Sequence, residues 1–275
     1  MPTLSILTAA FAPSAGFLPE TIASVSGLEI PSGWNVEWIV QEDGDKPVLG
    51  RHFTNLPGVR YAANGTRLGI GGTRNLALER ASGNLVRVLD VDDLLLPAAV
   101  ADLIPYFADN RIHWAAGQAD DLMTDGRRIS WDPLIPTGLV KAGAINDYAI
   151  EHGGNWPIHC AGLMARTETV RALGGWAASM TDEDLILFAA MSEVSDGFNH
   201  PATTWLYRQH PGQATRTDEW RGKSESGRRM ALQRAHAARM LKLAIDHDSV
   251  PESAESANEL RVDRALKDRE MNEYL

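Results

Sequence analysis

The short run Leu85–Leu89 ends in a cluster of aspartates, and this feature limits the folds open to the chain. Apolar and β-branched residues dominate the run, which is typical of a short buried strand. Asp90, Asp92 and Asp93 follow at once, and open α/β sheets bind ligands at the carboxyl ends of such strands. Asp90 and Asp92 point to the same side of an extended chain and suit a divalent cation that carries a diphosphate. The alternative is an acidic turn in which Asp92 or Asp93 caps a following helix.

Composition narrows the class of protein. The chain has 275 residues, of which 44% are hydrophobic, so it suits one large domain, or a domain with a subdomain, around a real core. A net charge of −10 argues against a broad basic surface for nucleic acid. Cys160 is the one cysteine, which excludes an internal disulfide and fits a reducing compartment. Because no apolar run reaches about 18 residues, we expect a cytoplasmic protein without a transmembrane segment.

Strands and helices alternate through the first half of the chain. This order predicts an α/β fold with a mainly parallel sheet and helices on both faces. The first strand-to-helix turn, residues 9–13, lacks the G-x-G-x-x-G pattern of dinucleotide-binding folds. Gly69–Gly72 stand before a later helix and fit either a turn or a close approach to a ligand. The expected strands are 4–9, 34–40, 58–62 and 85–89, and the expected helices are 18–25 and 73–81.

The second half is less regular. Residues 130–157 are rich in Pro, Gly and Trp, which indicates an ordered loop that covers a site. The acids at 181–184 open a helix, where negative charge is favourable. After residue 216 we expect an edge helix at 228–243 and an amphipathic helix at 251–270, which packs on the domain or forms a homodimer. The other expected elements are helices at 94–107, 168–173 and 185–192 and strands at 112–118, 158–165 and 203–207.

Several spaced motifs match one known pattern in the right order. On these motifs the chain resembles the family 2 glycosyltransferases, from about residue 4 to about residue 212. Two positions depart from the family pattern, with Glu42 in place of Asp and Thr73 in place of Ala. The motifs are Leu18–Val25, Glu42-Asp43-Gly44, Asn64-Gly65, Arg74-Asn75, Asp90-Val91-Asp92-Asp93, Gly174-Gly175-Trp176, Glu183-Asp184-Leu185 and Tyr207-Arg208-Gln209-His210.

The resemblance implies a GT-A-type, Rossmann-like fold and a metal-dependent hexosyl or N-acetylhexosaminyl transfer. The expected glycosyltransferase domain is 1–215, with a nucleotide-sugar-binding half at 1–110, an acceptor-binding half at 111–215 and a C-terminal helical extension at 216–275. The donor is a nucleotide sugar, and the acceptor a small molecule or glycan precursor with a hydroxyl or amine. Mn²⁺ or Mg²⁺ is the implied cofactor, because hard oxygen ligands suit both ions.

The resemblance also implies a role for each donor-side residue. Asp92 and His210 are the expected metal ligands, and Asp90 contacts the ribose or a metal-bound water. Asp93 serves as a second ligand, a donor-sugar contact or a helix cap. Asp43 accepts a hydrogen bond from N3–H of uracil or thymine, which favours a UDP- or dTDP-sugar. The remaining expected nucleotide-sugar contacts are Ala9, Glu42, Arg74 and Val91, with Arg74 and also Arg208 on the diphosphate.

The acids at 183–184 are the expected catalytic residues. Asp184 matches the family's general base, which takes the acceptor proton in an inverting displacement, and Glu183 orients either the acceptor or Asp184. The alternative is a pair of acids that favours the helix N-terminus by about 0.3–1 kcal/mol each. Trp156, Trp176 and Asp182 are expected to contact the acceptor, although both tryptophans suit a core equally well.

Other functions remain open on the residues alone. Asp90-Val91-Asp92 resembles the nucleophile motif of haloacid-dehalogenase-type phosphatases, but that motif normally lies on the first strand, which here has no acid. Nucleotidyl transfer on a similar fold usually needs a basic, glycine-rich first loop, and Phe11–Gly16 contains no Lys or Arg. A non-catalytic nucleotide-sugar-binding protein is the third alternative, and the presence of Asp184 argues against it.

Overall fold

The computed structural model describes residues 1–243 and 245, and within them ten strands form one sheet. The strands are β1 (Thr3–Phe11), β2 (Asn35–Asp43), β3 (Val59–Ala63), β4 (Leu85–Val88), β5 (Leu94–Leu95), β6 (Ile112–Leu122), β7 (Arg128–Ser130), β8 (Gly138–Val140), β9 (Leu163–Arg166) and β10 (Asp196–Arg208). The α-helices are α1 (Leu18–Ser26), α2 (Gly69–Glu79), α3 (Ala144–Glu151), α4 (Thr167–Ala172), α5 (Glu183–Val194) and α6 (Asp218–Met240).

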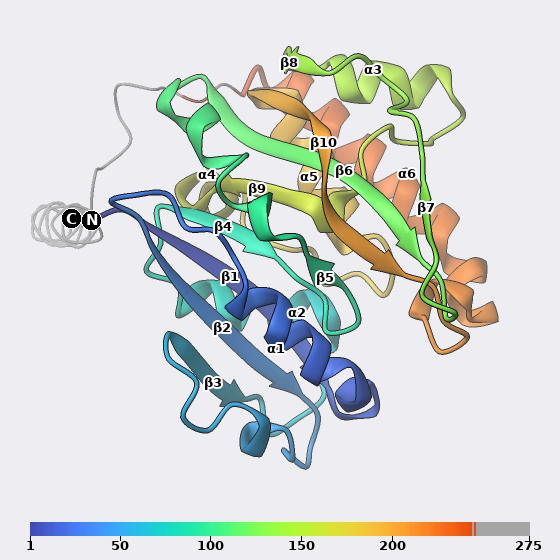
Figure 1. Ribbon diagram of the computed structural model, residues 1–275. Helices are drawn as coiled ribbons and strands as arrows, with labels where there is room; N and C mark the ends of the chain where they lie inside the picture. The colour runs from blue at the N-terminus through green and yellow to red at the C-terminus, as the bar shows by residue number, and fades with distance from the viewer. Residues whose placement is uncertain (244, 246–275) are drawn as a thin grey trace, which may run out of the picture. The chain divides into compact units, whose positions relative to one another are not determined.

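The strand order places the ends of the long strands together. The main path runs β3-β2-β1-β4-β9-β6-β10-β5 (Figure 1). Strands β1 to β4 are mutually parallel, and β9 is antiparallel to both β4 and β6. Strands β4 and β6 therefore run in the same direction, and β10 is parallel to β6. The carboxyl ends of β1, β2, β4, β6 and β10 consequently meet at one edge, which we call the carboxyl edge.

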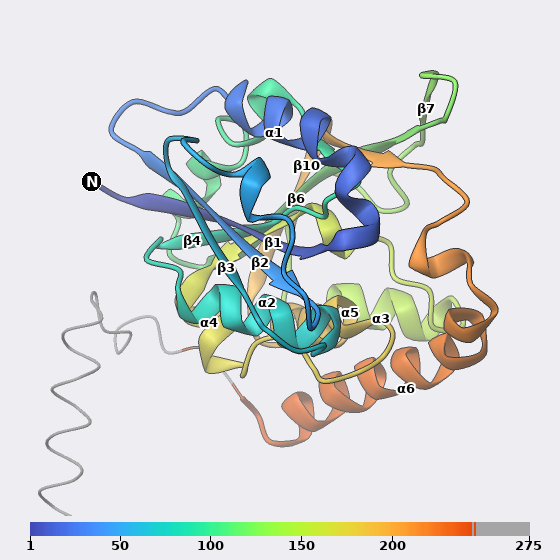
Figure 2. The same cartoon turned by 90° about the horizontal axis from the view of Figure 1, so that it is seen from below.

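Helices cover both faces of the sheet, as the sequence predicts. Helix α1 lies on one face, whereas α2, α4 and α5 lie on the other, with α6 outside α5 (Figure 2). Side chains of β1 alternate between the two cores, because successive residues of a strand point to opposite faces. Leu4 and Ile6 join the core under α1, and Leu7 joins the core under α2 and α5. This confirms the α/β class.

Helix α5 is buried on every side. Each of its residues from Leu185 to Ser192 is buried, because the sheet covers one side and α6 covers the other. Helix α6 turns small residues toward this contact, with Ala231, Ala235 and Ala238 buried. It begins at Asp218 rather than 228 and belongs to the same compact unit as the sheet, Met1–Ala244. The helix expected at 251–270 lies outside the described residues.

The helix predicted at 94–107 is wrong. Leu94 and Leu95 instead form β5, which pairs with the end of β10. Two short 3₁₀ helices follow, Pro97–Ala99 and Ile104–Ala108. Pro97 and Pro105 explain the error, since a proline lacks the amide proton and clashes with the preceding turn of an α-helix.

Three other predictions need correction. Gly69–Gly72 form the first turn of α2 rather than a loop before it, and a Cβ at Gly71 would lie 2.4 Å from the carbonyl oxygen of Ala177. The loop expected at 130–157 contains β8 and α3. The strand expected from residue 158 starts at Leu163, after a 3₁₀ turn at Cys160–Gly162. Within residues 1–243, no helix combines the length and apolar character that a bilayer crossing requires.

Candidate active site

The acids at the end of β2 hold neighbouring loops in place. Glu42 accepts hydrogen bonds from the backbone amides of Val48 and Leu49, both at 2.9 Å, and from the hydroxyl of Tyr61. Burial, together with this carboxylate, raises the pKa of Tyr61 to about 12. Glu42 is only 1% exposed. The structure therefore gives Glu42 a loop-organising role in place of the expected nucleotide contact.

Asp43 is bound in a similar way. Its carboxylate accepts hydrogen bonds from the backbone amides of Leu68 (2.7 Å) and Gly69 (3.1 Å) and from the side chain of Asn64 (3.0 Å). These bonds fix the loop that leads into α2 and satisfy amides at its first turn. A carboxylate offers about four acceptor positions, so Asp43 retains one position for a ligand.

An aromatic side chain that sequence reasoning missed lies beside Asp43. Phe11 ends β1, pairs in register with Asp43 and is 37% exposed. The guanidinium of Arg67 lies 5.1 Å from the centroid of the Phe11 ring. Ala9, two residues earlier on β1, is half-buried. The signal in the sequence was the aromatic residue at the end of the first strand.

At the end of β4, one arginine joins the two halves of the chain. Arg74 of α2 is 1% exposed. Its terminal nitrogens lie 2.6 Å from a carboxylate oxygen of Asp90 and 2.6 Å from one of Glu183. Burial acts to lower the pKa of Arg74, but Asp90 and Glu183 raise it above its ordinary value. Both terminal nitrogens of Arg74 thus bind carboxylates. Neither nitrogen points into the open space in which the expected diphosphate would lie.

The acids before and within the first turn of α5 point in different directions. Asp182 has a left-handed backbone, with φ of 57°, which Asp tolerates better than most residues. Glu183 points inward to Arg74 and is buried. Burial and then Asp184 raise the pKa of Glu183 to about 7, although Arg74 opposes the shift. Asp184 is half-buried, and its carboxylate accepts the backbone amide of Leu185 at 2.7 Å.

Asp182 faces α6. A Cβ built on Gly227 of α6 would lie 2.5 Å from a carboxylate oxygen of Asp182. That oxygen is buried and has no hydrogen-bond partner among the described residues. The hydroxyl of Thr181 also bonds to the backbone of α6, at the carbonyl of Lys223 (3.3 Å). The structure therefore places Asp182 in a helix contact rather than in the expected acceptor pocket.

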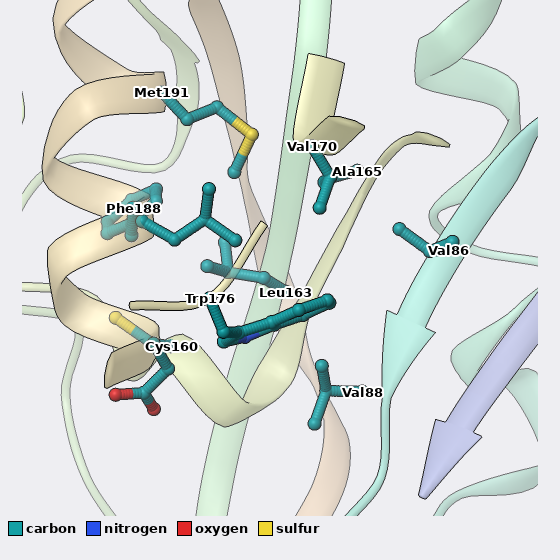
Figure 3. Close-up of a pocket in the computed structure, with 11 residues that line it drawn as sticks. Val86, Val88, Cys160, Leu163, Ala165, Val170, Trp176, Phe188 and Met191 are labelled. Carbon is teal, nitrogen blue, oxygen red and sulfur yellow. The ribbon is translucent and has the colours of Figure 1, made fainter. Parts of the chain in front are cut away.

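A small apolar cavity opens beside Asp184. It lies between β4, β9 and α5, and the indole of Trp176 forms part of its wall (Figure 3). Trp176 is 5% exposed, and Trp156 is half-buried with its indole nitrogen 3.1 Å from the side-chain oxygen of Asn146. Both tryptophans predicted to contact the acceptor therefore pack inside the fold. The lining residues are Val86, Val88, Cys160, Leu163, Ala165, Val170, Trp176, Asp184, Leu187, Phe188 and Met191.

The two residues predicted to bind a metal lie together. Asp92 and His210 are 2.9 Å apart, between a carboxylate oxygen and Nε2. Their side chains are 25% and 13% exposed. The His210 ring also lies against Phe17, with centroids 4.6 Å apart.

Taken alone, this pair is not a complete metal site. Among residues 1–243, no group of three or more His, Cys, Asp or Glu side chains is placed to hold a metal ion by itself. Protein sites for Mg²⁺ often use only one or two carboxylates and complete the coordination with substrate phosphates and water. Asp92 and His210 therefore fit an ion that arrives with a diphosphate, and they do not form an all-protein site.

The other two residues of the 91–93 segment are held by the fold. Asp93 is buried and accepts the backbone amide of Arg208 at 2.9 Å. Burial and the neighbouring aspartates raise its pKa well above the ordinary value. Val91 has a buried side chain, and its carbonyl accepts the hydroxyl of Thr21 at 2.5 Å. The guanidinium of Arg208 donates a hydrogen bond to the carbonyl oxygen of Asp92 at 2.7 Å, and so it does not point into open space.

His159 is a second residue that sequence reasoning missed. It follows the Pro/Trp-rich loop and precedes the 3₁₀ turn at Cys160–Gly162. Its side chain is exposed, yet the surrounding protein lowers the pKa of its imidazole, against the opposing influence of Asp184 and Asp90. Cys160, the residue after His159, lines the same cavity as Asp184, so His159 lies near this acid. No motif marked it, because it lies in a segment predicted as a plain strand.

Comparisons with known proteins identify the family and the fold of the chain. The model of the family "Glycosyl transferase family 2" matches residues 5–165. Solved structures with a similar fold include residues 1–349 of S. aureus TarS, at 15% identity and a TM-score of 0.58, covering 76% of this chain and 60% of that one. The TarS structure in complex with UDP-GlcNAc gives 16% identity, a TM-score of 0.60, and coverage of 78% and 60%. The chain thus spans about 60% of the length of these structures. No curated protein matches the sequence.

Proposed function

Because the chain belongs to glycosyl transferase family 2 and is thereby a nucleotide-sugar-dependent glycosyltransferase, we propose that it moves a sugar from a UDP-sugar to a hydroxyl or amine of an acceptor. One observation carries the proposal. Arg74 binds both Asp90, at the end of β4, and Glu183, next to Asp184. This contact holds a candidate base against the edge where a donor would lie. Family membership removes the phosphatase and nucleotidyl-transfer alternatives.

A uridine donor has support from two sources. TarS, which shares the fold, has been solved in complex with UDP and with UDP-GlcNAc. In this chain, Phe11 offers an exposed aromatic face beside Asp43, and Asp43 keeps one acceptor position. A pyrimidine with an N3–H group, as in uracil or thymine, would stack on the ring and donate to the carboxylate. Cytosine has no N3 proton to donate.

Asp92 and His210 would hold a Mn²⁺ or Mg²⁺ ion that comes with the diphosphate. Such an ion stabilises the negative charge that develops on the leaving nucleoside diphosphate. Imidazole accepts Mn²⁺ more readily than Mg²⁺, so His210 favours Mn²⁺. Asp90, tied to Arg74 through one oxygen, keeps its other oxygen for the ribose or a metal-bound water.

Asp184 would act as the general base. It is half-buried at the first turn of α5 and reaches the mouth of the apolar cavity. Its role is to accept the proton of the acceptor as that group attacks the anomeric carbon from the side opposite the diphosphate, with inversion. Glu183 and Arg74 position it, because their buried ion pair fixes the start of the helix.

The test is replacement of the base. Asp184→Asn should lower the rate of transfer, or of UDP-sugar hydrolysis with water as acceptor, by about 10²–10⁴-fold. UDP affinity measured by calorimetry in Mn²⁺ should change less than about threefold, since Asp184 does not touch the nucleotide. Asp182→Asn is the matched control, because Asp182 faces α6. Undiminished turnover in Asp184→Asn would exclude Asp184 as the base, and no affinity of the wild type for UDP would remove the proposed donor.

A further inference from the structure

His159 is an exposed imidazole whose ring is fixed but whose nitrogens are not engaged. Its ring centroid lies 4.9 Å from that of Trp205 and 4.8 Å from that of Tyr207, both on β10. Gly162 makes the contact possible, since a Cβ there would lie 2.3 Å from the indole nitrogen of Trp205. Among residues 1–243, neither ring nitrogen of His159 has a hydrogen-bond partner. A positioned group with free donors and acceptors suits a ligand.

Three carboxylates act on the charge of His159. Asp184, Asp90 and Asp121 each act to raise the pKa of its imidazole, although the surrounding protein lowers it below the ordinary value. Asp121 belongs to β6 and pairs in register with Tyr207 of β10, so both side chains lie on the same face of the sheet. His159, Tyr207 and Asp121 therefore form a line of neighbouring side chains that reaches the end of β6.

Trp131 extends this line. It follows β7 directly, is 64% exposed, and donates from its indole nitrogen to Asp121 at 3.2 Å. The other oxygen of Asp121 accepts the side-chain amide of Gln209 at 2.9 Å. The carboxylate thus holds an exposed indole in a defined orientation. Unlike Trp156 and Trp176, this tryptophan has a face open to a ligand.

The order of the strands in the sheet indicates which substrate His159, Asp121 and Trp131 would contact. The proposed contacts to the nucleoside, Phe11, Asp43 and Asp90, lie at the ends of β1, β2 and β4, whereas Asp121 and Tyr207 lie at the ends of β6 and β10, across β9. An acceptor whose hydroxyl meets Asp184 must extend away from the donor, toward β6 and β10. The second half of the carboxyl edge is therefore the acceptor side.

On the basis of the proposed function, we propose that Trp131 and His159 form an acceptor subsite for a sugar ring. The acceptor would then be a carbohydrate. The indole of Trp131 stacks on the apolar face of the ring. His159 hydrogen-bonds a ring hydroxyl near the attacking one, since a neutral imidazole both donates and accepts. The carboxylate of Asp121, which holds Trp131, disfavours a phosphate at this position.

The test uses saturation-transfer NMR with UDP and diamagnetic Mg²⁺ in place of the donor sugar nucleotide. The probes are the methyl β-glycosides of glucose, galactose and N-acetylglucosamine, with ribitol as an open-chain polyol. At least one glycoside should bind through its ring protons and more tightly than ribitol. Trp131→Ala should weaken this binding by about tenfold, and the UDP affinity should stay unchanged. Ile150→Ala, with a side chain 60% exposed on α3, is the matched control.

His159→Phe separates binding from packing, because phenylalanine keeps the contact with Trp205 and Tyr207 but lacks the nitrogens. It should weaken glycoside binding by about 2–10-fold and leave the UDP affinity unchanged. Glycoside binding that is the same in Trp131→Ala and His159→Phe as in the wild type would overturn the subsite. UDP binding without any glycoside binding, or ribitol binding as tightly as the glycosides, would also overturn it. Absence of UDP binding would instead overturn the proposed donor.

Discussion

Strands β2 and β4 both end in acids at the same edge, but the structure uses those acids differently. Glu42 and Asp43 are buried and accept backbone amides from the loops that follow them. Asp90 and Asp92 remain partly exposed and face charged or titratable side chains, Arg74 and His210. The acids of β2 therefore build the wall of the site, and those of β4 remain available to a ligand.

The difference shows that a strand ending in carboxylates has two physical outcomes. Long loops follow β2 and leave amides that need acceptors, because a buried unpaired amide costs free energy. A tight turn follows β4, where Asp93 accepts the backbone amide of Arg208 and leaves the other two acids free of backbone amides. The length of the loop after the strand, more than the acids themselves, separates the two cases.

The largest expected loss of stability comes from removing the positively charged Arg74, which lies at the end of β4. Arg74→Ala leaves Asp90 and Glu183 together without the positive charge that compensates them. Breaking a buried pair in this way costs about 3–5 kcal/mol, which urea denaturation can measure. Arg229→Ala, an exposed arginine paired with Glu225, is the control and should cost about 0.3–0.5 kcal/mol. Equal losses in the two variants would mean that the network does not join the halves of the chain.

A smaller loss of stability is expected from a substitution at the end of β2. Glu42→Gln keeps the shape of the side chain but turns an amide NH₂ toward the backbone amides of Val48 and Leu49. Loss of such a buried hydrogen bond costs about 1–3 kcal/mol, again measured by urea denaturation. Asp45→Asn, on the exposed part of the same loop, provides the comparison. A Glu42→Gln variant as stable as Asp45→Asn would break the contrast between wall-building and ligand-facing acids.

Local patterns predicted the parallel sheet, and the family resemblance predicted that Asp92 and His210 lie together. The pattern of strands and helices depends on apolar periodicity, which the chain carries at each position. The partners of Arg74 could not be predicted, because Glu183 lies 109 residues away and the contact depends on how α5 packs. Trp131 and His159 were missed for a similar reason, since exposure depends on tertiary packing and the sequence does not distinguish Trp131 from Trp156.

The buried carboxylate of Glu183 should make the stability of the protein depend on pH. Its folded pKa of about 7 exceeds the ordinary 4.5, so the folded protein retains a proton that the unfolded chain has released. Its contribution to stability is complete below about pH 4.5 and is lost as the pH rises through about 7, by at most about 1.4 kcal/mol per pH unit. Glu183→Gln removes this titration. The difference in unfolding free energy between wild type and variant should therefore change across this window, and a flat difference would contradict the raised pKa.

The smallest effect on stability, and the sharpest effect on binding, is expected at Asp92. Its side chain is partly exposed and its pair with His210 is reachable by solvent, so Asp92→Asn should change the free energy of unfolding by at most about 1 kcal/mol. The same variant should lose at least about tenfold in UDP affinity when Mn²⁺ is present, because the amide is a poor ligand for the ion that would bridge the diphosphate. With EDTA, wild type and variant should bind UDP alike. If Mn²⁺ strengthens UDP binding equally in both proteins, Asp92 does not hold the ion, and the contrast between the ligand-facing acids of β4 and the wall-building acids of β2 would fail at Asp92.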